Sequence, residues 1–134
     1  MAAVELTAAS FDKTVDENSI VLIDFWAPWC GPCKNFAPVF EAASARHPDA
    51  VFAKVNTDDE QEIAAHFQIR SIPTLMVFRE QIIVFSQPGA LPQNALEQVV
   101  SKAKEIDMDD VRKQISEQQE KSPPAQDSAP PPAA

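Results

Sequence analysis

Two cysteines separated by two residues constrain this chain more than any other feature of its sequence. They are the only cysteines among 134 residues, and they lie in the segment WCGPC at residues 29–33. An apolar run over residues 20–26 precedes this segment and is typical of a buried strand, whereas a helical pattern follows it. Both thiols are therefore expected where a strand passes into a helix, with Cys30 at or just before the first helical turn.

The start of a helix favours a negatively charged sulfur. The first backbone N–H groups have no partner within the helix, and the helix dipole is positive there. A cysteine in this position has its pKa lowered from about 8.5 toward 7 or below, so Cys30 becomes nucleophilic near neutral pH. Cys33 lies one turn further along, within reach of a mixed disulfide at Cys30. Gly31 permits a tight turn beside the sulfurs, and Pro32 suits a helix start because no N–H is needed there.

Residues 21–34, VLIDFWAPWCGPCK, closely resemble the active-site segment of thioredoxins. The resemblance covers about residues 4–104 and implies an α/β protein with the thioredoxin fold, a central mixed β-sheet flanked by helices on both faces. It implies a protein disulfide reductase that uses a Cys30/Cys33 dithiol and binds no cofactor. It also implies disulfide-containing proteins as substrates, and recycling by a flavoprotein similar to thioredoxin reductase that takes its electrons from NADPH. The Gly31-Pro32 pair resembles the reducing branch of the superfamily, and an oxidase or isomerase is the rival.

Hydrophobic periodicity predicts strands and helices in the order βαβαβαββα. Expected strands cover residues 4–6, 20–26, 51–56, 74–78 and 82–85, and expected helices cover residues 8–18, 32–46, 58–67 and 92–104. The segment between the last two strands, residues 78–82, contains no glycine for the positive φ angles of a tight hairpin turn. The turn type and the register of the edge strand therefore stay open.

The chain is expected to divide into three segments. Residues 1–104 form the domain that resembles thioredoxins, and residues 105–121 form a short amphipathic helix capped by Asp107. Residues 122–134 contain five prolines and are expected to be a disordered tail. This extension leaves an alternative function open, that of a redox-independent adaptor or chaperone-like binding module which uses the extension as its contact.

Charge and composition argue against several classes of partner. The net charge of −9 disfavours nucleic acid and anionic membranes. The sequence has no run of about 18 apolar residues and no secretory signal, so a cytoplasmic protein is expected, and it is expected to be a monomer. Tetrahedral zinc needs four ligands, and His47 and His66 lie in no ligand spacing with the single cysteine pair, so no metal is expected.

Asp24 interrupts the apolar run of the central strand and is expected to be buried. Burial raises the pKa of a carboxyl group, and a buried base behind Cys33 could accept its proton when this thiol attacks a mixed disulfide. Lys54 stands inside another apolar strand and resembles the family's lysine that pairs with the buried aspartate. The alternatives are an ion pair with a purely structural role and a lysine that extends from the edge of the sheet.

Residues 71–74, Ser-Ile-Pro-Thr, resemble the loop in which thioredoxins carry a cis-proline opposite the cysteines. The resemblance implies that Pro73 leaves the backbone N–H and C=O of Ile72 free for an extended substrate peptide. A flat apolar rim around Cys30 is expected to bind the substrate and to consist of Trp29, Ile72, Pro73, Gly89 and Ala90.

Overall fold

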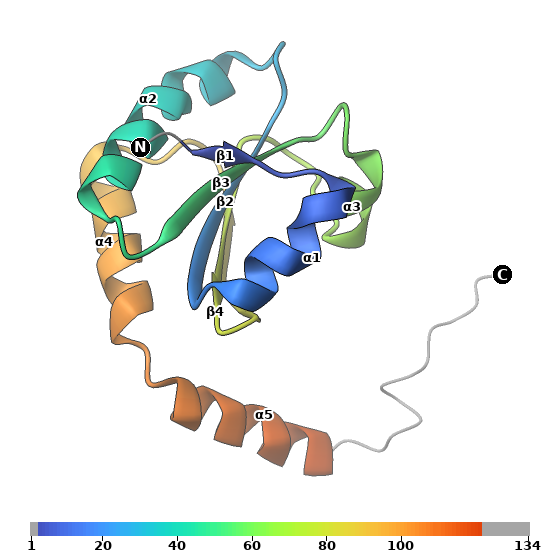
Figure 1. Ribbon diagram of the computed structural model, residues 1–134, viewed down its shortest axis with the longest axis vertical. Coiled ribbons are helices and arrows are strands. Elements are labelled where there is room, and N and C mark those ends of the chain that lie inside the picture. Colours follow the sequence, from blue (N-terminus) through green and yellow to red (C-terminus); the bar gives the residue numbers. More distant parts are fainter. Residues whose placement is uncertain (1–2, 122–134) are drawn as a thin grey trace, which may run out of the picture.

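A mixed sheet of five strands forms the centre of the protein, which this computed structural model describes from residue 3 to residue 121 (Figure 1). The strands are β1 (Val4–Glu5), β2 (Ile20–Trp26), β3 (Val51–Asn56), β4 (Thr74–Arg79) and β5 (Ile82–Pro88). They lie in the order β1-β3-β2-β4-β5. Strand β3 is parallel to β1 and β2, whereas β4 is antiparallel to β2 and β5. The tail expected over residues 122–134 lies outside the described residues.

Helices cover both faces of the sheet, because the central strand is apolar on both sides. Alternate residues of β2 point to opposite faces. Its residues Val21, Ile23 and Phe25 pack with α1 (Ala8–Glu17) and α3 (Gln61–His66). Its residues Ile20 and Leu22 pack with α2 (Gly31–Arg46) and α4 (Gln93–Glu105). The predicted fold class is confirmed.

Among the elements predicted before residue 105, two differ by three residues at one end from their predicted ranges, and the others differ by at most one residue at either end. Helix α3 begins at Gln61 and not at residue 58, because the acidic residues before it form a turn on Asn56. The Asn56 side chain accepts from the Asp58 N–H at 2.9 Å, and its carbonyl accepts from the Glu60 N–H at 2.9 Å. Strand β5 continues to Pro88, beyond the predicted end at residue 85, since it stays paired with β4 as far as Thr74.

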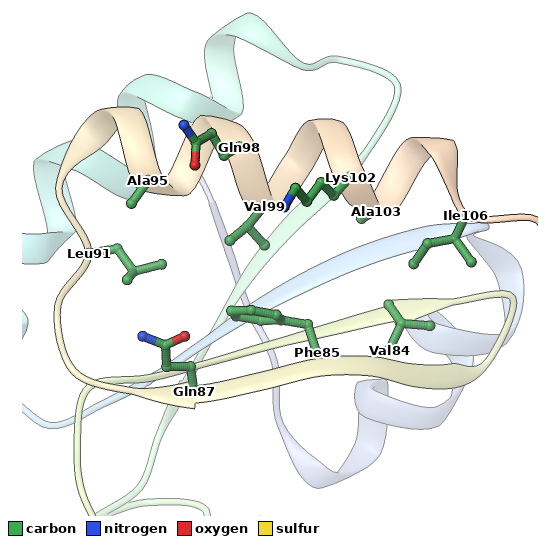
Figure 2. A pocket seen from close by; sticks show the side chains of 10 residues that line it. All are labelled: Val84, Phe85, Gln87, Leu91, Ala95, Gln98, Val99, Lys102, Ala103 and Ile106. Carbon is green, nitrogen blue, oxygen red and sulfur yellow. The ribbon is translucent and has the colours of Figure 1, made fainter.

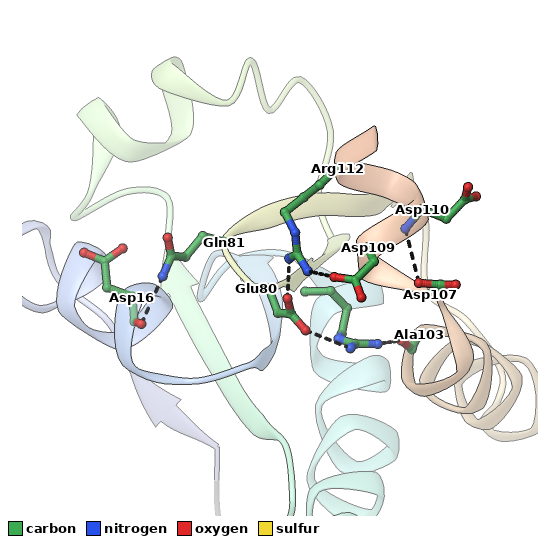
Figure 3. Close-up of polar contacts among 9 residues, drawn as sticks. Asp16, Glu80, Gln81, Ala103, Asp107, Asp109, Asp110 and Arg112 are labelled. Carbon is green, nitrogen blue, oxygen red and sulfur yellow. Dashed lines mark hydrogen bonds and ion pairs between the residues drawn. The ribbon is translucent and has the colours of Figure 1, made fainter. Parts of the chain in front are cut away.

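The turn between β4 and β5 is tight although it lacks glycine. Glu80 and Gln81 have φ angles of 51° and 74°, in the left-handed region that crowds a Cβ atom. The Gln81 amide donates to the Asp16 carbonyl at 3.2 Å, and Glu80 forms ion pairs with Arg79 and Arg112 (Figure 3). These contacts hold the turn in a conformation that its sequence does not favour.

Helix α5 (Met108–Lys121) follows α4 and runs past the β4–β5 turn (Figure 1). Its first turn is capped by Asp107, whose Oδ1 accepts from the Asp110 N–H at 3.2 Å (Figure 3). Met108 is 4% exposed, and Arg112 connects the helix to Glu80 of the turn. A helix is present within the predicted segment 105–121, but it begins at Met108, whereas Glu105 still belongs to α4, and its start contacts the chain's own hairpin. The division of the chain at residue 104 stays a prediction.

Candidate active site

A groove of about 400 Å³ lies between α4 and the edge strand β5 (Figure 2). Apolar side chains form most of its wall, among them Phe85 of β5, Val99 of α4 and Ile106 at the end of α4. Lys102 is the one ionisable side chain in this wall, and no cysteine lines it. The groove therefore offers no thiol and no acid–base pair for disulfide chemistry, and the two cysteines lie outside it.

The two cysteines lie at the start of α2, as predicted. Cys30 is the N-cap residue, since its carbonyl accepts from the Lys34 N–H at 3.2 Å in the first bond of the helix. Cys30 and Cys33 form a disulfide with their Cα atoms 5.2 Å apart. The Cys33 N–H donates to Cys30 Sγ at 3.2 Å, so an unpaired backbone donor of the helix start points at this sulfur. Such a donor stabilises a thiolate at Cys30 once the disulfide is reduced.

A loop far away in the sequence covers the disulfide. The Ile72 carbonyl oxygen lies 3.7 Å from Cys30 Sγ, and the peptide bond between Ile72 and Pro73 is cis, as the resemblance implies. Gly89 donates its N–H to the Pro73 carbonyl at 2.8 Å and has a φ angle of 102°, which favours glycine. The fold thus brings Ile72, Pro73 and Gly89 together beside Cys30, and Ala90 follows Gly89 as an exposed residue.

Trp29 is the most exposed large apolar side chain beside the disulfide. It is 70% exposed, and its indole N–H donates to Asp58 Oδ2 at 3.0 Å. Trp29 and Ile72 line a cavity of about 190 Å³ together with Thr57 and Arg70. The side chain therefore stands at the surface in a defined orientation, next to a depression that can receive a substrate side chain.

Asp24 is fully buried, as predicted, on the face of β2 that α2 covers. Its side chain points to the same face as that of Leu22, which packs against residues of α2 and α4. Cys33, which belongs to α2, is 2% exposed. Neither carboxylate oxygen has a hydrogen-bond partner among the described residues. Burial raises the pKa of Asp24 to about 7, against the opposing charge of Lys54. This carboxyl group can therefore take up or release a proton near neutral pH.

The predicted ion pair between Asp24 and Lys54 is not formed. The two residues are register partners on β2 and β3, but the Lys54 ammonium lies 4.5 Å from the centroid of the Trp26 ring. A cation over an indole face is stabilised by the ring quadrupole, so Lys54 has a partner other than the carboxylate. Its charge still lowers the pKa of Asp24, although less than burial raises it.

Sequence reasoning missed two acidic residues near the site. Asp58 accepts the hydrogen bond of Trp29, but it stands in an acidic run that is typical of a helix start. Glu5 lies opposite Lys54 on β1 and raises the pKa of Asp24. The relation of Glu5 to Asp24 depends on the strand order β1-β3-β2, which the sequence of β1 does not indicate.

Comparisons with known proteins agree with this geometry. The thioredoxin family model matches residues 2–102. A Streptomyces coelicolor protein described as thioredoxin 2 is 58% identical over 118 residues, 88% of each chain. The thioredoxin of Bacillus subtilis is 42% identical over 103 residues, 76% of this chain and 98% of the relative. A solved structure of thioredoxin from Plasmodium falciparum superposes with a TM-score of 0.71 at 37% identity and covers 75% of this chain and 98% of that one.

The fold, the cysteine pair and these relatives define a thiol–disulfide oxidoreductase. The chain belongs to the thioredoxin family. Between residues 3 and 121, no helix is long and apolar enough to cross a membrane. Over the same range, no group of three or more His, Cys, Asp or Glu residues is placed to hold a metal ion.

Proposed function

We propose that this chain reduces disulfides of protein substrates, with Cys30 as the attacking thiol and Cys33 as the resolving thiol. One observation carries this assignment of roles. Cys30 is the N-cap residue of α2 and its sulfur accepts the Cys33 N–H at 3.2 Å, which favours a thiolate at Cys30. Cys33 sits one turn inside the helix, and both residues are buried, Cys30 at 4% and Cys33 at 2% exposure.

The reaction proceeds by two exchanges at sulfur. The Cys30 thiolate attacks one sulfur of the substrate disulfide, whose S–S bond breaks and releases a first thiolate. Cys33 then loses its proton and attacks Cys30 Sγ, so that the mixed disulfide breaks and a second substrate thiolate leaves. The substrate gains two electrons and, from solvent and the resolving step, two protons. The chain is left oxidised, with the bond between Cys30 and Cys33.

Asp24 is proposed as the acceptor of the Cys33 proton. Its pKa of about 7 leaves a large ionised fraction at neutral pH, and α2 covers the face of the sheet on which it lies. A base works best with a pKa near the working pH, because both its ionised fraction and its proton affinity are then high. Lys54 supports the site by lowering the pKa of this carboxyl group without an ion pair.

The residues around Cys30 are proposed as the substrate-binding rim, in which Trp29, Gly89 and Ala90 are exposed, Ile72 is half-buried and Pro73 is buried. Extended substrate backbone would pair with Ile72, whose carbonyl lies next to Cys30 Sγ, in the manner of strand addition. Gly31 and Pro32 are exposed at the helix start and leave room for the approaching chain. The rim consists of Trp29, Ile72, Pro73, Gly89 and Ala90.

Partners and location follow from the family and stay proposals. A flavoprotein similar to thioredoxin reductase would return the chain to its dithiol form with electrons from NADPH, which this chain does not bind itself. We propose a monomer in the cytoplasm that acts without nucleic acid or membrane. The adaptor alternative gains no support, since the start of α5 contacts Glu80 of the same chain.

Insulin reduction with dithiothreitol or a reductase as electron source tests the assignment. The Cys30→Ser variant should lose all turnover. The Cys33→Ser variant should form a mixed disulfide with substrate and stall, and mass spectrometry should detect this adduct. Turnover by Cys30→Ser, or a substrate adduct at Cys33 in the Cys30→Ser variant, would show that Cys33 and not Cys30 attacks the substrate. Deletion of residues 105–134 should leave turnover intact.

A further inference from the structure

Three ionisable side chains form a row across the neighbouring strands β1, β3 and β2. Glu5 of β1 is the register partner of Lys54 of β3, and Lys54 is in turn the register partner of Asp24 of β2. Side chains of register partners point to the same face of a sheet, so all three lie on the face that α2 covers. Strands are about 4.8 Å apart, which places Glu5 and Asp24 about 10 Å apart at the backbone.

The row holds one cation between two carboxyl groups. Lys54 makes no ion pair with either carboxylate and lies over the Trp26 ring. Burial raises the pKa of Glu5, whereas the charge of Lys54 lowers it. One end of the row is the fully buried Asp24 and the other is the exposed Glu5 on the edge strand.

The charged residues that act on Asp24 lie on β3 and β1, on one flank of β2, and none lies opposite it on β4. On β4 its register partner is Leu75, which is apolar and buried. On α2, which covers this face, Cys33 is buried and titrates only after the disulfide is reduced. The remaining charges are Lys54 and Glu5, and their effects on the proton affinity of Asp24 are opposite in sign.

We propose that Glu5 is a positioning residue for disulfide exchange. The carboxylates of Glu5 and Asp24 both interact with the Lys54 ammonium group, and Glu5 thereby sets the pH range in which Asp24 accepts the Cys33 proton. This inference rests on the proposed function. A negative charge at Glu5 repels an ionised Asp24. It also offsets part of the attraction between Lys54 and the Asp24 carboxylate. Without Glu5, the lysine would act on Asp24 alone and would keep it ionised at lower pH.

The test measures the titration of Asp24 and the rate of exchange in the same full-length proteins. The Asp24 side-chain carboxyl carbon is followed by NMR from pH 4 to pH 10 in the reduced form. Glu5→Gln should lower the midpoint by about half a unit, as two charges about 10 Å apart in a partly screened setting would give. Lys54→Met should raise the midpoint, and the double variant should return it toward the wild-type value.

Rates of insulin reduction over the same pH range provide the second readout, and the acid limb of the profile should move with each midpoint. Asp59→Asn is the matched control, because Asp59 acts on Glu5 but not on Asp24, and it should leave both readouts unchanged. An unmoved midpoint in Glu5→Gln would overturn the role of Glu5 alone. A moved midpoint with an unmoved rate profile would overturn the role of Asp24 as proton acceptor, and this inference with it.

Discussion

Replacing Asp24 by asparagine tests whether a buried carboxyl group with a raised pKa destabilises the fold at neutral pH. The side chain is fully buried, has no hydrogen-bond partner among the described residues, and has a pKa raised by burial to about 7 from its ordinary value of 3.8. An amide stays neutral at every pH. The comparison of the two proteins therefore isolates the free energy of ionising this one group.

The sign and the magnitude follow from the two pKa values. Below about pH 4 the carboxyl group is protonated in both the folded and the unfolded chain. Between about pH 4 and pH 7 only the folded chain keeps the proton, so the free energy of unfolding falls as the pH rises. A difference of about three pKa units corresponds to about 4 kcal/mol, and the full penalty is present above pH 7.

Urea denaturation of the oxidised proteins, followed by tryptophan fluorescence at pH 4 and pH 8, measures this penalty. The free energy of unfolding of Asp24→Asn, relative to wild type, should be higher at pH 8 than at pH 4 by about 4 kcal/mol. Any constant cost of burying the amide cancels in this difference. Asp12→Asn, the same change at an exposed position of α1, should show a difference under about 0.5 kcal/mol. A difference under about 1 kcal/mol for Asp24→Asn would refute the argument.

Three further predictions concern the hairpin, α5 and the substrate-binding rim. Gln81→Gly should raise the free energy of unfolding by about 0.5 kcal/mol, because glycine relieves Cβ crowding that costs about 1–2 kcal/mol at a φ of 74°, whereas the exposed hydrogen bond lost to the Asp16 carbonyl contributes about 1 kcal/mol; a loss of stability in urea denaturation would contradict this. Arg112→Ala should speed amide hydrogen exchange in α5 and change global stability by less than about 1 kcal/mol, since its ion pairs lie at the surface; slow exchange that persists would show that other contacts hold the helix. Trp29→Ala should raise KM for insulin several-fold with little change in kcat, and Asp58→Asn should have a smaller effect in the same direction; an unchanged KM would remove Trp29 from the rim.

Local sequence was sufficient for the central strand and the helix that follows it. The apolar run over residues 20–26 is long and uninterrupted except at Asp24, so its burial on both faces and the burial of that carboxyl group could both be predicted. The position of Cys30 at the helix start depends only on neighbouring residues, and it was predicted for that reason. The resemblance added the cis-proline loop, which no local pattern could have indicated.

Element ends and the hairpin depended on partners that are distant in sequence. Strand β5 continues to Pro88 because β4 offers it a partner, and propensity at its end does not predict this. Glu80 and Gln81 adopt positive φ angles against their own preference, since Arg112 and the Asp16 carbonyl bind them there. Together with the pairing of β4 and β5, these contacts offset a local cost of about 1–2 kcal/mol per residue.

The sequence by itself determined the chemistry: two thiols one helical turn apart at a helix start, and a carboxyl group inside an apolar strand. These are properties of neighbouring residues and of hydrophobic periodicity, which act over a few positions along the chain. Only the tertiary structure decided which charges surround that carboxyl group. The order β1-β3-β2 places Lys54 next to Asp24 and Glu5 one strand beyond Lys54, and the lysine lies over the Trp26 ring without an ion pair to Asp24. Strand order and side-chain placement arise from long-range packing, and the electrostatics of the site follow from them.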